Sequence, residues 1–290
     1  MADTPGMQDI RGLNIEKTIT GMALVEYVFK DLCTIVPSST WQNRYFTQTN
    51  ADLTGGTGSA IEGIPRLANF PHVEKGTTQV NSYMKKFGAE QVISFEDVHF
   101  DAIDVIKDSL LRVARAITKS VDAEIWDVIT ENRSVSTINS VTIGAGSEWN
   151  SATIANRDPL QNIIDARAEI MKDNYSVNAN VSLLLSPTDF ANMIGNASIR
   201  NVGQFYTDSV TENGIVGRIA GCTVRVSNNV TADYAAVVVD KTCATWREGK
   251  PLTTVTIDNQ GISYTVRSWE IGNCELKNPE AVCLIINTQA

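Results

Sequence analysis

One stretch of this chain constrains its fold more than any other. Between residues 96 and 131 the apolar residues alternate in steps of three and four, which puts them on one face of an α-helix. A helix over the whole stretch would be about 50 Å long, whereas helices in globular domains average about 11–12 residues. The sequence therefore predicts a long amphipathic spine helix. Its apolar face runs through Ile103, Ile106, Leu110, Val113, Ile117, Val121, Ile125 and Val128.

A polar excursion precedes this helix. Residues 41–78 contain few apolar side chains, and their middle is the glycine-rich run from Gly55 to Gly58. A segment of this composition cannot bury a core of its own, so another surface must hold it. We expect an extended hairpin with a flexible tip, followed by an alternating strand over 80–95. Such a reaching arm favours assembly over catalysis as the first hypothesis.

The rest of the chain predicts a mixture of strands and shorter helices. Asp158 followed by Pro159 is a strong helix start, and Ser186 with Asp189 forms a second one. The strand–helix–strand order between residues 158 and 245 favours a compact mixed subdomain. Strands are expected over 181–185, 222–226, 234–239, 253–257, 262–269 and 281–286. The helix that begins at Asp158 would turn one apolar face toward the core, formed by Leu160, Ile163, Ile164, Ala168, Ile170 and Met171.

The beginning of the chain gives fewer signals. Residues 1–14 are polar and predict a mobile arm, and the spacing over 15–33 predicts a short helix. There is neither an apolar signal-peptide core nor a membrane-spanning run of about 18 apolar residues. We therefore expect the chain to stay in the compartment where it is made. Its five cysteines lack metal-site or redox-motif spacing, which predicts free thiols.

The formal net charge of −9 bears on nucleic-acid binding. A sequence-specific DNA-binding protein usually carries a basic stripe, and the linear sequence shows none. An acidic surface stays soluble and does not adhere to nucleic acid. If the protein meets DNA, we expect it to enclose the DNA without sequence-specific binding.

Catalytic chemistry finds little support in the sequence. The chain has two histidines, His72 and His99, and it lacks the Gly-X-Ser-X-Gly turn of a hydrolase nucleophile. The glycine runs at 55–58 and 144–146 lack the lysine, the third glycine or the flanking elements of nucleotide-binding motifs. The sequence therefore predicts no catalytic residue, no cofactor and no enzymatic activity.

A row of aspartates at the start of the spine helix is the one candidate for a metal site. Asp97, Asp101, Asp104 and Asp108 fall on one helical face, and their carboxylates suit a hard cation. One straight helix cannot wrap around a cation, however, and a solvated acidic face is the commoner outcome. We therefore predict no metal site.

The order of these parts is similar to that of a known family. The strand Phe87–Asp97 (FGAEQVISFED) leads into the spine helix, then 184–190 (LLSPTDF) opens a helix, and 221–227 (GCTVRVS) follows. This order resembles the major capsid proteins of tailed double-stranded DNA viruses, which have the Hong Kong 97-type capsid fold. The resemblance covers about residues 40–290 and implies an α+β fold.

The resemblance also implies a division of the chain. An N-terminal arm would take residues 1–40, and an extended E-loop hairpin would take 41–78, with Gly55, Gly56 and Gly58 at its inter-subunit tip. The spine helix would belong to a peripheral P-domain. The P-domain would span 79–157, a mixed axial A-domain 158–245, and return strands of both domains 246–290.

The function implied is that of a major capsid protein of a tailed bacteriophage. Copies would assemble in the host cytoplasm into pentamers and hexamers of an icosahedral virion shell that encloses double-stranded DNA. The implied partners are further copies of the chain and a portal protein, with either a separate scaffold protein or none, and with room for a decoration protein. Lys75 and Asn278 are the loose counterparts of a crosslinking lysine and asparagine in some members.

Two alternatives remain open. An encapsulin-type nanocompartment shell, which packages a cargo enzyme, would keep the fold and change the content. The short helix expected over 15–33 favours it, whereas the long glycine-tipped E-loop does not. A soluble α+β enzyme is the second alternative, and the shortage of histidines argues against it.

Overall fold

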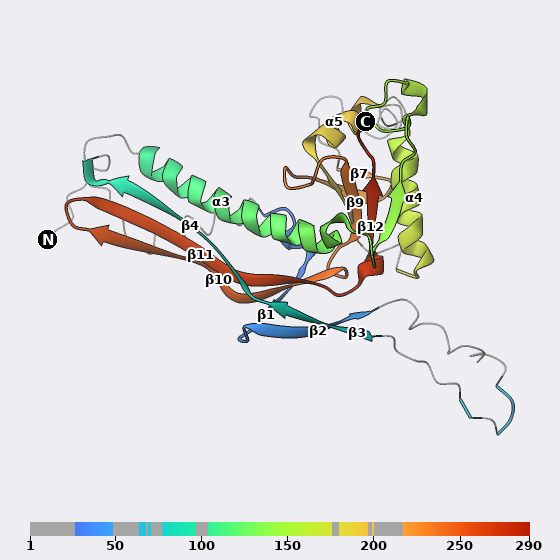
Figure 1. The fold of residues 1–290 in the computed structure, drawn as a ribbon, viewed down its shortest axis with the longest axis horizontal. Coiled ribbons are helices and arrows are strands. Elements are labelled where there is room, and N and C mark those ends of the chain that lie inside the picture. Colours follow the sequence, from blue (N-terminus) through green and yellow to red (C-terminus); the bar gives the residue numbers. More distant parts are fainter. Residues whose placement is uncertain are drawn as a thin grey trace.

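The computed structural model describes residues 27–48, 64–67, 69–70, 77–96, 104–175, 180–196, 199 and 217–290. A long arm, built from helix α3 and a long β-hairpin, joins a compact mixed unit at one end (Figure 1). A smaller hairpin lies beneath this junction (Figure 1). None of the helices in the described ranges combines the length and hydropathy of a membrane-spanning segment.

Helix α3 (Asp104–Ile129) confirms the predicted spine over the described residues. Its 26 residues span about 39 Å at 1.5 Å per residue. Ala114, Trp126 and Ile129 are also buried, so the buried face is wider than the sequence pattern. Of the expected apolar face, Leu110, Val113, Ile117, Val121 and Ile125 are buried.

A four-stranded sheet runs along α3 and completes the arm. Its order is β1 (Thr34–Pro37), β10 (Ala244–Asn259), β11 (Ser263–Leu276) and β4 (Lys85–Ser94). The predicted hairpin of 253–269 is confirmed, but its strands continue inward to Ala244 and Leu276. At its turn Ile262 N–H donates to Asn259 O (2.9 Å), and Gly261 has a φ of +74°. That left-handed conformation favours glycine.

The compact unit is a six-stranded mixed sheet with two helices. The strand order is β5 (Asn139–Thr142), β12 (Val282–Ile286), β9 (Tyr234–Val239), β6 (Val181–Leu185), β8 (Cys222–Val226) and β7 (Arg218–Ile219). Helix α4 (Pro159–Lys172) packs on β12 and β5, and α5 (Pro187–Gly195) follows β6. Every residue of β6 is buried, as expected for the central strand of an enclosed sheet.

The predicted helix starts form as expected. The Asp158 side chain accepts a hydrogen bond from the Gln161 N–H, and the Ser186 hydroxyl accepts one from the Asp189 N–H. The predicted inward face of α4 is only partly correct. Ile163 and Ile170 are buried, but Ile164 is 43 % exposed.

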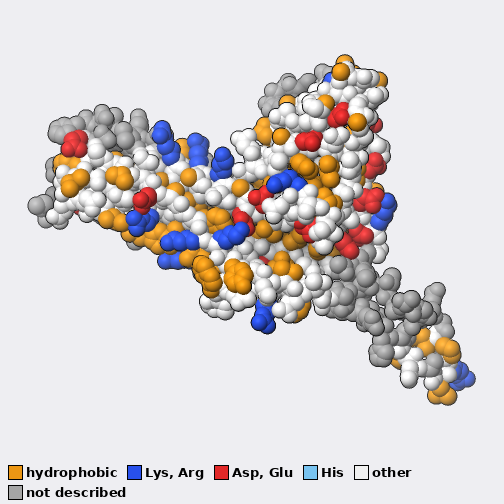
Figure 2. Space-filling view, in the orientation of Figure 1, with side chains coloured by type: hydrophobic (Ala, Val, Ile, Leu, Met, Phe, Trp, Pro, Cys, Tyr) orange, Lys and Arg blue, Asp and Glu red, His pale blue; other side chains and the backbone are white. Residues whose placement is uncertain are grey.

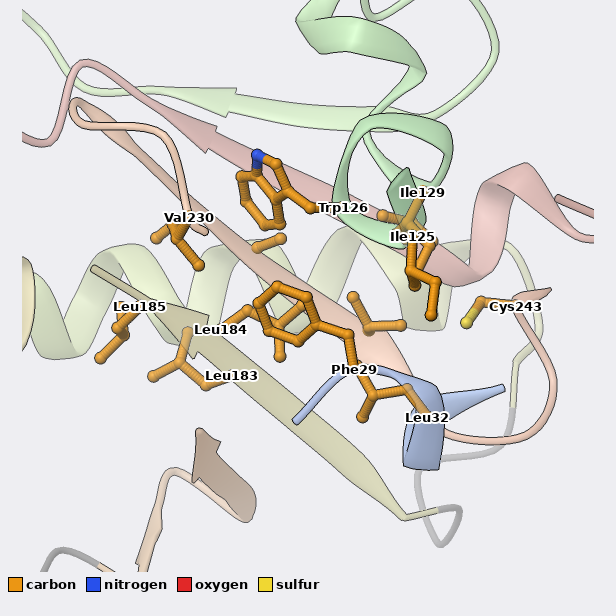
Figure 3. Close-up of a cluster of buried hydrophobic side chains, with 14 of the residues drawn as sticks. Phe29, Leu32, Ile125, Trp126, Ile129, Leu183, Leu184, Leu185, Val230 and Cys243 are labelled. Atoms are coloured by element: carbon orange, nitrogen blue, oxygen red, sulfur yellow. The ribbon is translucent and has the colours of Figure 1, made fainter. Parts of the chain in front are cut away.

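One apolar core joins the arm to the compact unit (Figure 3). Trp126 of α3 is part of this core, with its ring centroid 6.1 Å from that of Phe29. The Trp126 indole N–H donates to the Thr231 hydroxyl (3.1 Å), which lies in the compact unit. Leu183, Leu184, Val230 and Cys243 belong to the same cluster. The two parts therefore share a core and do not form separate hydrophobic centres.

Several local predictions differ from the structure. In the described part of the expected helix over 15–33, the helical residues form one 3₁₀ turn, η1 (Lys30–Leu32), and strand β1 follows. The expected strand over 80–95 is two strands, because the chain breaks at Met84 between β3 (Thr77–Tyr83) and β4. Strand β5 was not expected, and it pairs with β12 in the six-stranded sheet.

The chain leaves α3 through a left-handed turn. Glu131, Asn132, Arg133 and Val135 all have φ between +49° and +67°, and η3 (Glu131–Arg133) lies within this turn. The Glu131 carboxylate accepts hydrogen bonds from the N–H and hydroxyl groups of Ser136 and Thr137. These donors lower the pKa of Glu131, although burial acts in the opposite direction. The remaining 3₁₀ turns are η4 (Ile154–Asn156) and η5 (Pro279–Ala281).

Candidate assembly surfaces

The small hairpin carries the first candidate surface. β2 (Gln42–Gln48) and β3 (Thr77–Tyr83) form a two-stranded sheet in register from Gln42–Tyr83 to Gln48–Thr77. Within the described residues, no third strand pairs with them. An isolated two-stranded hairpin is at best marginally stable in water, so contacts outside the hairpin must hold it.

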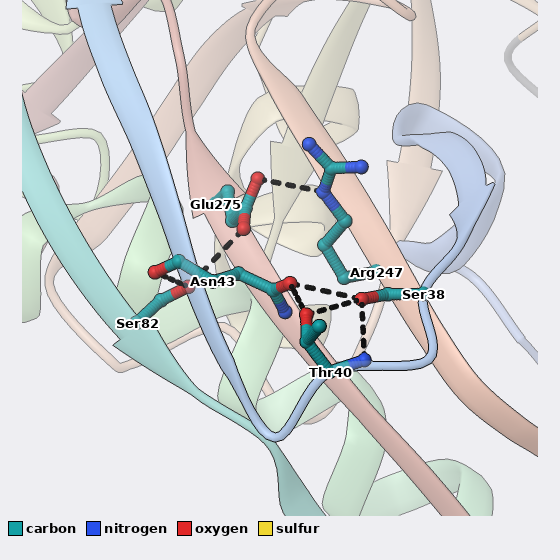
Figure 4. Close-up of polar contacts among 6 residues, drawn as sticks. All are labelled: Ser38, Thr40, Asn43, Ser82, Arg247 and Glu275. Atoms are coloured by element: carbon teal, nitrogen blue, oxygen red, sulfur yellow. Dashed lines mark hydrogen bonds and ion pairs between the residues drawn. The ribbon is translucent and has the colours of Figure 1, made fainter.

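A polar network fixes the base of this hairpin to the arm (Figure 4). Glu275 of β11 is fully buried and accepts from the Ser82 hydroxyl (3.1 Å) and from the Arg247 Nε–H (3.0 Å). The Asn43 side-chain oxygen accepts from the hydroxyls of Ser38 (2.8 Å) and Thr40 (2.7 Å). Charge-assisted bonds to a buried carboxylate are among the stronger hydrogen bonds in proteins. The hairpin is therefore anchored by polar contacts at its root.

Backbone contacts extend this anchor. The Gln48 N–H donates to the Lys277 carbonyl and the Met84 N–H donates to the Trp41 carbonyl, both at 2.9 Å. Tyr45 lies on the side of the hairpin that faces the arm, and burial followed by the nearby Glu275 charge raises its pKa. One face of the hairpin is therefore held by the arm, which leaves the opposite face available.

That opposite face carries exposed aromatic side chains. Phe46 is 53 % exposed and Tyr83 is 57 % exposed, and the adjacent Trp41 is 62 % exposed. Aromatic residues are enriched in the cores of protein interfaces. Single exposed apolar residues are common, but three aromatics on one small hairpin indicate a contact surface.

The segment that enters β1 is docked on α3 by a buried carboxylate. The Asp122 carboxylate accepts from the Val28 N–H (2.9 Å) and the Phe29 N–H (3.2 Å). Burial raises the pKa of Asp122 to about 6, against the lowering effect of these hydrogen bonds. The chain before β1 is therefore held to the spine by a group that titrates near neutral pH.

A second buried group holds the same segment to the sheet. The Lys30 ammonium lies 2.5 Å from Glu270 Oε1, and the Tyr27 hydroxyl donates to Glu270 Oε2 (2.6 Å). The ammonium also lies over the Tyr27 and Trp246 rings, at 4.9 and 5.5 Å from their centroids. Breaking a buried pair leaves an uncompensated charge, so this contact makes the segment an integral part of the arm.

Most of the predicted site residues fall outside the described ranges. Gly55, Gly56, Gly58 and Lys75 lie there, as do His72, His99, Asp97 and Asp101. Of the predicted crosslink pair, Asn278 is described. Its side-chain amide donates to the Thr242 carbonyl (2.7 Å). Among the described residues there is no cluster of ligands that could hold a metal ion.

The buried carboxylates that anchor these segments were not predicted from the sequence. Asp122 lies on the apolar face of α3, between buried Thr118 and Ile125, and a carboxylate in that position signals a specific partner. Glu270 and Glu275 are themselves buried in β11, where most residues are buried. The available signal was a charged residue at a position where the period of the helix or strand places buried residues. The partners come from distant parts of the chain, so they could not be read from sequence.

The comparison with family models gives a match over most of the chain. A family model described as phage capsid protein matches residues 77–285. The search of curated proteins found no match.

Solved structures share the fold at low sequence identity. The virus-like particle from Pyrococcus furiosus is 12 % identical with a TM-score of 0.62, and covers 94 % of this chain and 98 % of its own. A chain of Mycobacterium phage Che8 is 14 % identical with a TM-score of 0.65, over 91 % and 93 %. The capsid of the cyanophage P-SCSP1u is 12 % identical with a TM-score of 0.66, over 99 % and 92 %.

Proposed function

Because this chain belongs to the phage capsid protein family, we propose that it assembles into pentamers and hexamers of an icosahedral shell around double-stranded DNA. The coarser role, a structural protein of the virion capsid that acts in many copies, follows from the family and its structural neighbours. The predicted α+β fold of the Hong Kong 97 type is confirmed.

The anchored hairpin is the observation that supports this proposal most directly. Its root is fixed to the arm by Glu275 and Arg247, while its far face exposes Phe46 and Tyr83. A hairpin held along one face by the arm, with aromatics on its free face, suits contact with a neighbouring copy. We assign residues 41–78 to the E-loop that makes this contact, with Gly55, Gly56 and Gly58 at its tip.

The other domain assignments are part of the same proposal. Residues 1–40 form the N-terminal arm, 79–157 the P-domain with α3, 158–245 the A-domain, and 246–290 the return strands of both. The strand pairing adds detail: β3 continues to Tyr83, and β5 pairs in the six-stranded sheet. The hairpin therefore reaches past residue 78, and the A-domain sheet draws strands from both sides of 158–245.

Partners follow from the same function. A shell that is filled with DNA needs a portal protein at one vertex, and we propose a separate scaffold protein and assembly in the host cytoplasm. Decoration proteins are compatible with the fold. The interior encloses DNA without sequence-specific contacts, in line with the net charge of −9.

A covalent crosslink between Lys75 and Asn278 is a further part of the proposal. The Asn278 amide donates to the Thr242 carbonyl, so that bond must break before a lysine of another copy can replace the amide nitrogen. The reaction would join the lysine amine to the side-chain carbonyl and release ammonia. Denaturing electrophoresis of assembled particles tests this, because bands of monomer alone would eliminate the crosslink.

One alternative keeps the shell and changes its content. The likeness to a virus-like particle from Pyrococcus furiosus supports a compartment without a viral genome as the second candidate. Particles that hold a cargo protein in place of DNA and a portal would favour this candidate.

Electron microscopy of the purified chain by negative staining, with size-exclusion chromatography, tests the main proposal. We expect closed shells, or rings of five and six copies, and DNA inside particles produced with the viral genome. A monomer or dimer under all salt and protein concentrations, with a scaffold protein co-expressed, would contradict the proposed function.

A further inference from the structure

The compact unit and the arm expose side chains of opposite charge. Helix α4 packs on β12, β5 and β9 of the six-stranded sheet, whereas α3 packs on β4 and β11 of the arm. The outer side of α4 presents carboxylates, and the exposed side of α3 presents basic groups. In Figure 2 the acidic side chains gather over the compact unit, and the basic ones lie in a row along the arm. A subunit with this polarity can bind copies of itself in a fixed order.

The acidic α4 face comprises Ile154, Asp158, Ile164, Asp165 and Glu169. Its apolar members are well exposed, at 72 % for Ile154 and 43 % for Ile164. Gln161 donates to Asp165 (2.7 Å) and Lys172 pairs with Glu169 (2.5 Å), so these carboxylates are held in place on the helix, and Lys172 offsets the charge of Glu169. An apolar centre with a charged rim is the usual anatomy of a protein interface.

The basic notch comprises Arg112, Arg115 and Lys119 of α3. The three residues follow one helical face, and their side chains are exposed. Arg115 and Lys119 border a hollow of about 330 Å³ between α3 and the turn after β8. The Asn229 side chain donates to the Lys119 carbonyl (3.2 Å) and joins the two walls.

We propose that the acidic α4 face of one copy docks into the basic notch of the next copy. The inference rests on the proposed function, since it specifies the contact that closes the rings of five and six. The two surfaces differ and lie on different parts of the subunit, α4 of the compact unit and α3 of the arm, so the contact is heterologous and repeats around a ring. Each copy has a net charge of −9, so copies repel each other at long range. The complementary surfaces then determine in which relative orientation two copies bind.

The direction of the small hairpin agrees with this arrangement. The end of the hairpin at Gln48 and Thr77, where β2 leads on to β3, points toward the side of the molecule on which α4 lies (Figure 1). A hairpin that contacts a neighbour therefore contacts the same neighbour that the acidic α4 face meets. Both contacts then act in one interface.

A second copy fits the notch better than nucleic acid does. The hollow is also lined by Asp122, and Asp31, which is 69 % exposed, lies 3.9 Å from Arg225 near the same segment. The exposed Asp31 carboxylate repels a phosphate backbone, which carries a negative charge at every nucleotide. The α4 face carries fewer negative charges, and apolar side chains separate them, so it can place its carboxylates against Arg115 and Lys119 and away from Asp31.

Charge reversal tests the proposal on the full-length chain. One variant carries Asp165→Lys and Glu169→Lys, and the other carries Arg115→Glu and Lys119→Glu. In each variant alone, like charges face each other across every contact. The protein concentration at which rings form should therefore rise at least about tenfold. The chain with all four substitutions restores complementarity and assembles again. The neutral variants Asp165→Asn and Glu169→Gln should keep the circular dichroism spectrum and melting temperature of the wild type and should lose less assembly than the reversed variants.

Mixing the two reversed variants gives the sharpest readout. The first has two basic surfaces and the second two acidic ones, so they bind only in alternation. Alternation closes rings with an even number of members, so the mixture forms hexamers and fails to form pentamers. Mass spectrometry of native rings measures this directly.

The possible failures can be told apart. A wild-type chain that forms no rings overturns the proposed function and, with it, this docking. Wild-type shells, together with reversed variants that assemble equally well, overturn the docking alone. If the Arg115→Glu/Lys119→Glu variant assembles normally but its particles lose DNA, the notch binds nucleic acid and the docking is wrong.

Discussion

At the scale of single residues, the Asp122 carboxyl makes stability depend on pH. Its folded-state pKa of about 6 exceeds the ordinary value of 3.8, so the charged form is the one that folding disfavours. The free energy of unfolding therefore rises by up to about 3 kcal/mol as the pH falls from about 7 to about 4 and Asp122 becomes protonated. Its protonation would strengthen the docking of residues 27–33 on the spine.

An Asp122→Asn variant isolates this effect. The wild type should gain stability relative to the variant when urea unfolding is compared at pH 7.5 and pH 5, because only the wild type loses a buried charge. If the wild type instead loses stability relative to the variant at pH 5, the hydrogen bonds from Val28 and Phe29 to the charged carboxylate outweigh the cost of its burial.

Glu275 gives a second prediction at this scale. Glu275→Ala leaves Arg247 and Ser82 without their partner at a buried site, which should cost roughly 3 kcal/mol of unfolding free energy. Amide exchange in β2 and β3 should accelerate, since the root of the hairpin is released. The matched control is Glu90→Ala, which breaks an ion pair of similar length (2.8 Å) between half-exposed partners and should cost under about 1 kcal/mol.

At the scale of elements, the E-loop is expected to contribute to assembly more than to folding. Deleting residues 55–60 should leave the melting temperature of the monomer nearly unchanged, because β2 and β3 are anchored to the arm at their root. The same deletion should weaken assembly, as followed by light scattering. If the subunit instead unfolds, the deleted residues belong to the core and the domain assignment is wrong.

Regular elements were largely predictable, and irregular ones were not. The periodicity of α3 and the capping residues Asp158 and Ser186 are local signals, so sequence alone located those helices. Strand β1 is short and is stabilised by parallel pairing with β10, more than 200 positions away, which no local pattern encodes. The same reason hid β5, whose partner is β12.

The candidate surfaces were harder to predict than the fold. The linear sequence shows no basic stripe, yet folding of α3 lines up Arg112, Arg115 and Lys119 on one exposed face. The exposure of Ile164 contradicted the expected inward face of α4, because the helix packs on the sheet through a narrower contact. Which side of an amphipathic helix remains open depends on its neighbours, and single-sequence patterns do not contain that information.

At the scale of the whole molecule, the shared core predicts that the arm and the compact unit unfold together. Trp126→Ala removes the largest side chain at their junction and should cost about 3–5 kcal/mol. In the wild type, the unfolding curve followed by tryptophan fluorescence and the one followed by far-ultraviolet circular dichroism should coincide as denaturant is added. Two separate transitions in the wild type would show that the two parts are independent units.

The burial of every cysteine has a consequence for the assembled particle. All five thiols are free and buried, and burial raises the pKa of Cys222, of Cys243 and, to about 12, of Cys283. The thiolate is the reactive form, so these sulfurs resist alkylating reagents. A single cysteine introduced on the surface would then be the one thiol that a maleimide dye finds in each subunit. Every copy in a shell could be labelled at the same chosen atom, which makes the particle an addressable scaffold.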